Sequence, residues 1–103
     1  MEKESHKEAH RPSIGRIVHY RLSDVDIDGL EPDGAPLRDR LNGLVAGDYI
    51  PAMVVRTWAE PASHAKLVNL RCFPDGAVAT LWRTSVEQGD GNGQWTWPPK
   101  VSA

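Results

Sequence analysis

The segment that most constrains the fold is residues 65–86, AKLVNLRCFPDGAVATLWRTSV. Between residues 68 and 72 apolar side chains recur at every second position, which is the spacing of a strand with one buried face. Pro74-Asp75-Gly76 then predicts a tight turn, because proline fixes φ, aspartate bonds the local backbone and glycine accepts positive φ. Residues 78–86 return to a β-rich composition. Since an isolated hairpin is only marginally stable in water, the rest of the chain must supply further strands.

Three other segments have the composition of strands. They are residues 14–22 (IGRIVHYRL), 51–58 (PAMVVRTW) and 94–98 (QWTWP). In the first of them Val18, Tyr20 and Leu22 share one face, and His19 lies on the other. Together with the two arms of the hairpin, these segments predict five short strands.

The long segment between the first two strands has two halves. Residues 23–35 are acidic and rich in turn formers. Residues 36–46 place leucines at helical spacing, with Pro36 at a first-turn position and Gly47 as a stop. A short helix is therefore expected within a long loop.

The acidic half contains the spacing Asp24-x-Asp26-x-Asp28-Gly29, which matches the beginning of a calcium-binding loop. The bidentate glutamate expected at the twelfth position of such a loop is missing, because Ala35 stands there. We therefore expect a solvated acidic turn, and keep Asp24, Asp26 and Asp28 only as a weak calcium-like candidate.

The order of these segments predicts an all-β fold. Five short strands with one long loop and short helix after the first strand resemble the Src-homology-3-like small barrel, in which a sheet curled on itself hides its edges. A five-stranded oligonucleotide-binding type of barrel is the alternative. Residues 13–103 are expected to form this single domain, and residues 1–12, which lack an apolar period, a flexible N-terminal arm.

Charge and cysteine content exclude several classes of protein. The formal charge of −2 argues against a protein that binds long nucleic acid through the phosphate backbone. No segment approaches the roughly 20 apolar residues that span a bilayer, and the N-terminus lacks the apolar run of a secretory signal. The single Cys72 lies in phase with buried strand positions, so a buried thiol in a reducing, cytoplasmic setting is expected.

Five motifs carry a family resemblance. In order, SIGRIVHYRL, PAMVVRTW, VNLRCFPDG, LWRTSV and GQWTWPP resemble a family of small proteins found in tailed bacteriophages and prophages, over about two-thirds of the chain. The resemblance implies a phage or prophage origin, and hence the cytoplasm of an infected bacterium, but no general activity. The positions that match the family motifs are His19, Tyr20, Val54, Val55, Val68, Asn69, Leu70, Gly76, Trp95 and Trp97.

The chain departs from the family motifs in three places. Its loop after the first strand is longer, Thr96 replaces a histidine between the last two tryptophans, and Glu87-Gln88 replace a proline and a tyrosine. The long loop and the final connection are where a small barrel would bind a ligand.

The chemistry-bearing residues favour binding over catalysis. No nucleophile–base, zinc-ligand or phosphate-loop spacing occurs, so we expect no enzyme and no cofactor.

Of the four tryptophans, Trp82 is expected in the core, whereas the others lie at strand ends, where a barrel opens. Indole rings beside guanidinium groups suit a flat ligand that carries phosphate. The candidate ligand-binding residues are Arg56, Trp58, Asn69, Arg71, Arg83, Trp95, Trp97, His19 and Tyr20. The simpler alternative is that the rings fill the core and the arginines pair with aspartates.

These residues and the family resemblance leave two alternative hypotheses for the function. The first is a non-catalytic phage protein that sequesters a small nucleotide-like host immune signal, a class of protein that is often a homo-oligomer. The second is a virion-accessory or protein–protein interaction module that uses residues 23–49 as its contact surface.

Overall fold

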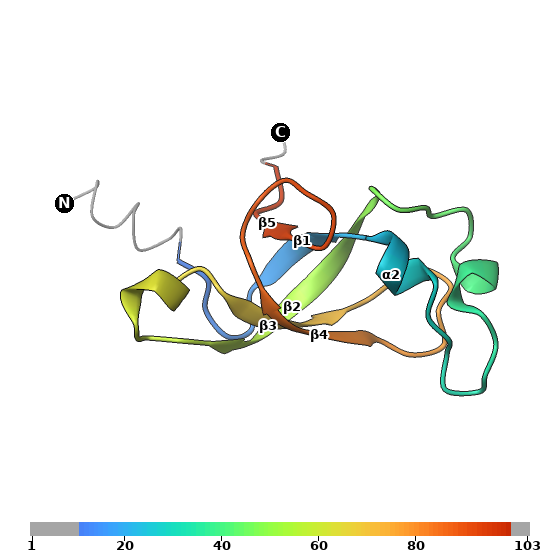
Figure 1. Ribbon diagram of the computed structural model, residues 1–103, viewed down its shortest axis with the longest axis horizontal. Coiled ribbons are helices and arrows are strands. Elements are labelled where there is room, and N and C mark those ends of the chain that lie inside the picture. Colours follow the sequence, from blue (N-terminus) through green and yellow to red (C-terminus); the bar gives the residue numbers. More distant parts are fainter. Residues whose placement is uncertain (1–10, 100–103) are drawn as a thin grey trace.

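The computed structural model describes residues 11–99, and the expected arm of residues 1–12 lies largely outside them. Five antiparallel strands form one sheet in the order β4-β3-β2-β1-β5 (Figure 1). The strands are β1 (Ile17–Arg21), β2 (Tyr49–Thr57), β3 (Val68–Cys72), β4 (Leu81–Val86) and β5 (Trp95–Thr96). The sheet curls into a half-barrel, and a parallel bridge from Gln88 to Trp95 links the chain beyond β4 to β5. The predicted all-β class with five strands is confirmed.

The core follows the predicted alternation. The side chains that point into the curl of the sheet are Val18, Tyr20, Leu22, Ile50, Ala52, Val54, Val68, Leu70, Cys72, Val86 and Trp95. Ile27, Leu37 and Leu41, from the long loop, pack on them. Cys72 is fully buried as predicted, and burial raises the pKa of its thiol to about 12, so the thiol is unreactive at neutral pH.

Two β-bulges bend the sheet. In β2, Val54 pairs with Leu70 but Arg56 pairs with Asn69, so one residue is extra. In β4 the irregularity falls at Ser85, which has a φ of 51° and whose N–H donates to the Asn69 side-chain oxygen at 2.8 Å. Bulges increase the local twist of a strand, and Asn69 therefore stabilises the curvature of the barrel.

The helical turns of the long loop differ from the prediction: the second half of the loop contains less helix than expected, and the first half contains a turn that was not expected. The expected helix over residues 36–46 is a single 3₁₀ turn, η1 (Leu37–Arg40), since Asn42 and Gly43 take positive φ and end it. A helical turn that was not expected, α2 (Asp24–Ile27), begins at Ser23, whose side chain accepts from the Asp26 N–H. A second 3₁₀ turn, η2 (Ala62–His64), follows β2.

The connection from β3 to β4 is longer than the predicted tight turn, because β4 begins only at Leu81. Gly76 takes a φ of 86°, and a Cβ added there would lie 2.1 Å from the carbonyl oxygen of Arg40. The turn is therefore packed against the end of η1. The placement of Trp82 in the core was wrong: it lies on the outer face of the sheet and is 52% exposed.

Candidate functional site

The acidic loop, residues 23–48, is attached to the barrel through Asp26. This carboxylate is buried and accepts hydrogen bonds from the Tyr20 hydroxyl at 2.8 Å and the Ser23 N–H at 2.9 Å. It also forms an ion pair with Arg83 of β4. Burial alone would raise the pKa of Asp26, but the hydrogen bonds from Ser23, Tyr20 and Arg83 outweigh burial and hold it below the ordinary value. Burial and the bond to Asp26 raise the pKa of Tyr20. Tyr20 and Arg83, both predicted to bind ligand, are therefore engaged within the fold.

A second carboxylate, Glu31, fastens the other half of the same loop. It accepts from Arg40 at 2.8 Å and from the Val78 N–H at 2.7 Å, and it also bonds the N–H of Ala79. The side-chain hydrogen bond from Arg40 is the main reason why the pKa of Glu31 lies below its ordinary value. The expectation of a merely solvated acidic turn is wrong, since two of its carboxylates join the loop to distant strands and turns.

The calcium-like candidate is not supported by the geometry. Asp24 and Asp26 lie in the helical turn α2, Asp26 is paired with Arg83, and Asp28 is paired with Arg38. Within residues 11–99, no group of three His, Cys, Asp or Glu side chains is arranged to hold a metal ion.

Trp95 is a core residue rather than a rim residue. Its ring is fully buried, and its indole N–H donates to the Lys66 carbonyl oxygen at 2.9 Å. Trp97 packs edge-on against it, with ring centroids 5.3 Å apart, and is partly buried. The Arg16 guanidinium lies 4.9 Å from the Trp97 ring centroid. Trp97 is therefore shared between the core and the surface.

Trp58 lies at the end of β2 and lines a cavity of about 300 Å³, hereafter the Trp58 cavity. The guanidinium of Arg56 lies over its indole, 5.3 Å from the ring centroid. The other lining residues are Arg11, Pro12, Thr57, Ala59, Ala62 and Ala65. Sequence reasoning missed Arg11 by placing it in the N-terminal arm; the apolar Pro12 beside it, which is buried, was the available signal.

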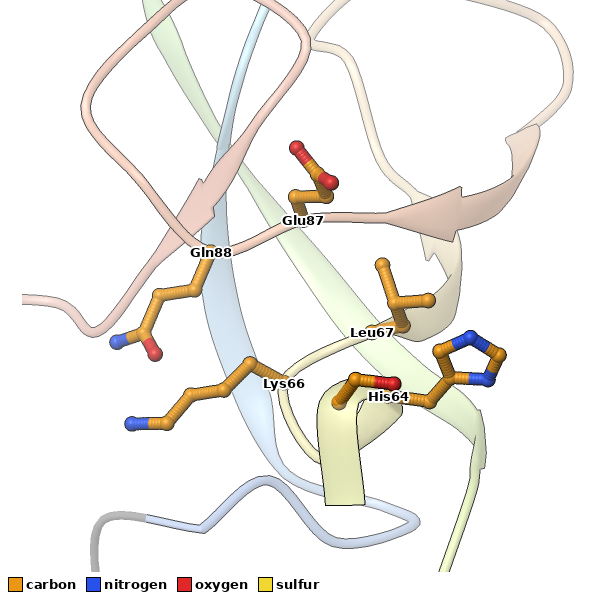
Figure 2. A pocket seen from close by; sticks show the side chains of 6 residues that line it. His64, Lys66, Leu67, Glu87 and Gln88 are labelled. Atoms are coloured by element: carbon orange, nitrogen blue, oxygen red, sulfur yellow. The ribbon is translucent and has the colours of Figure 1, made fainter. Parts of the chain in front are cut away.

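A larger and more polar cavity, of about 460 Å³, is lined in part by residues of the segment 58–67 as well. Its lining residues are Ser63, His64, Lys66, Leu67, Glu87 and Gln88. Figure 2 shows the side chains of Lys66 and Gln88 extending toward the same side, with His64 beyond Leu67 on the other. Among the described residues, the lining holds no indole or phenyl ring, and it mixes a cation with a carboxylate.

The remaining predicted site residues lie on the outer face of the sheet. Asn69 stabilises the bulge at Ser85. Arg71 is exposed, between its register partners Met53 and Trp82. His19 contacts Tyr49, with ring centroids 5.9 Å apart. Of the nine predicted residues, only Trp58 lines a cavity found within residues 11–99 that also has a predicted guanidinium, that of Arg56, stacked on its ring. Tyr20 and Arg83 meet at Asp26, and Trp95 and Trp97 pack on each other, in both cases within the fold.

No protein-family model, curated protein or solved structure matches this chain. Among the described residues, no helix has the length and apolar character that crossing a bilayer requires.

Proposed function

We propose that this protein is a non-catalytic binding protein whose ligand is a small, planar, anionic molecule of nucleotide-like chemistry, bound in the Trp58 cavity. The observation that carries the proposal is the combination of an indole that lines the cavity, a guanidinium stacked on that indole, and Arg11 on the cavity wall.

Each part of the lining suits such a ligand. An aromatic ring stacks a nucleobase with about 1–3 kcal/mol, and Arg56 covers only one side of the Trp58 ring. The small side chains Ala59, Ala62 and Ala65 leave room for a flat group against the ring. A guanidinium such as that of Arg11 pairs with phosphate through two parallel hydrogen bonds.

The size and chemistry of the cavity limit what happens to the ligand. A volume of about 300 Å³ is at the lower end of the range for ligand sites, which fits one base with its sugar and phosphate rather than a polymer. The lining residues within 11–99 include no carboxylate, imidazole or thiol that could act as a base or nucleophile. This composition supports the proposal of binding without turnover.

The resemblance to phage proteins gives the proposal a biological setting. In the cytoplasm of an infected bacterium, a phage protein that holds a nucleotide-like immune signal without converting it would lower the free concentration of that signal. This role as an anti-defence protein is part of the proposal, and the lining of the Trp58 cavity supports it through its chemistry.

The proposal is tested by a thermal-shift screen of the full chain against linear and cyclic nucleotides, followed by calorimetry on each hit. A ligand at 100 times its dissociation constant stabilises the folded state by about 2.7 kcal/mol. Trp58→Ala should abolish the shift, whereas the matched control Trp82→Ala, which removes an indole from the outer face of the sheet, should retain it. A shift that survives Trp58→Ala, or no shift across the panel, would contradict the proposal.

A further inference from the structure

The outer face of the sheet is unusually apolar for a surface. Ile17, Met53, Arg71 and Trp82 lie in one row across β1, β2, β3 and β4, since each is the register partner of the next. The large apolar side chains exposed on this face are Ile17, Tyr49, Met53, Val55, Phe73 and Trp82, between 36% and 52% exposed. Contiguous apolar surface of this kind marks interaction sites on soluble proteins.

The charge on this face is of one sign. None of the five strands contains an aspartate or a glutamate. Arg71 stands in the middle of the apolar row, is exposed, and forms no ion pair within residues 11–99. A partner for this face therefore needs apolar side chains with carboxylates beside them.

The acidic loop of the same protein has that composition. It holds seven acidic and two basic side chains. Asp26, Asp28, Glu31 and Asp33 are ion-paired within the fold, whereas Asp24, Asp39 and Asp48 form no ion pair within residues 11–99. It also exposes Val25, Leu30 and Val45 to between 60% and 82%, although these are apolar residues. Val25 follows the exposed Asp24 directly in α2, so a carboxylate and an apolar side chain are presented together.

We propose that the outer face of one copy binds the acidic loop of a second copy, with Arg71 facing the exposed Asp24 and the apolar side chains of the row covering Val25 and Leu30. The two surfaces differ, so the contact is heterologous and repeats from copy to copy as a ring or a filament. This assembly is independent of the Trp58 cavity, which lies on other residues.

The test is the mass of the full chain in solution, measured by light scattering on a sizing column at rising protein and salt concentrations. We expect a mass above the 11.4 kDa of one chain that falls as salt screens the charges. Arg71→Glu and Asp24→Arg should each give monomers, because each reversal places like charges together. Lys66→Glu, an equal charge change on another surface, is the matched control and should leave the mass unchanged.

Mixing the two monomeric variants gives the decisive measurement. Arg71→Glu presents an acidic face and an acidic loop, whereas Asp24→Arg presents a basic face and a loop with a reversed charge. Each face is then complementary to the loop of the other variant, so the mixture should recover the mass of the wild type. A wild type that is monomeric at every concentration would overturn the proposal, and so would a mixture that stays monomeric. Circular dichroism of each variant shows that it is folded.

Discussion

The two ends of the half-barrel use arginine in different ways. At one end, which holds the acidic loop and residues 73–80, Arg38, Arg40 and Arg83 are paired with carboxylates. At the other end, around residues 58–67, Arg16 and Arg56 lie over indole rings. The two ends lie far apart along the molecule (Figure 1).

The difference separates residues that hold the fold from residues that can hold a ligand. A guanidinium already paired with a carboxylate has its charge neutralised and some of its N–H donors occupied, so it offers less to an anion. A guanidinium stacked on an indole keeps its charge and its N–H donors, because the ring takes neither. The paired arginines of the loop end are therefore structural, whereas the arginines at the end with Trp58 are available to an anionic ligand.

The largest expected effect is the loss of Asp26. Asp26→Ala leaves the Arg83 charge and the Tyr20 hydroxyl without their shared partner, and removing one member of a buried ion pair costs about 3 kcal/mol or more. Urea unfolding should show this loss, whereas Asp24→Ala, an exposed neighbour in α2, should change stability by less than about 0.5 kcal/mol. Equal effects of the two substitutions would show that the loop end is not held through Asp26.

A somewhat smaller loss is expected from Gly76→Ala. The substitution combines a left-handed backbone, which costs about 1–2 kcal/mol with a side chain, and a Cβ placed against the carbonyl oxygen of Arg40. Gly34→Ala is the matched control, because Gly34 has nearly the same φ but nothing within 4 Å of the added Cβ. The difference in unfolding free energy between the two variants measures how tightly the turn packs on η1. No difference would mean that the turn can move away at little cost.

Acid should weaken the loop end. The folded pKa of Asp26 lies below the ordinary value of 3.8, so its stabilising contribution is complete above that pH and is lost as pH falls through the folded pKa. Unfolding free energies measured by urea between pH 7 and pH 3 should therefore fall below about pH 4. Asp26→Asn should show a shallower fall over this range, and a slope identical to that of the wild type would exclude Asp26 as its source.

Part of this fold was predictable because its signals are local. The burial of Val18 and Tyr20, and of Leu70 and Cys72, follows from period-2 alternation, which needs no knowledge of the rest of the chain. The turn α2 also had a local signal that was overlooked, since Ser23 with Asp26 three residues later is a capping pattern.

The rest depends on contacts between distant residues. The pair of Asp26 and Arg83 spans 57 positions, and no local pattern distinguishes it from a solvated aspartate. The burial of the tryptophans also depends on distant contacts. Trp95 is buried because the chain after β4 pairs with β5, whereas Trp82 is exposed because its position in the alternation of β4 places it on the outer face of the sheet. For the candidate site, Arg56 beside Trp58 was predictable from alternation, but Arg11 was not, since only the folded chain brings it there.

The smallest expected effect compares Trp97 with Trp58. Trp97 packs edge-on against the buried Trp95, and such aromatic pairs contribute about 0.5–1.5 kcal/mol beyond the area that they bury. Trp97→Ala should therefore lower the unfolding free energy by at least about 1 kcal/mol, measured in urea without ligand. Trp58→Ala should change it by less, because the Trp58 ring is bordered by a cavity and by Arg56 rather than by the core. The reverse order would mean that Trp58 supports the fold and that Trp97 is the ring available to a ligand, which would move the binding site from the Trp58 cavity to the surface beneath Arg16.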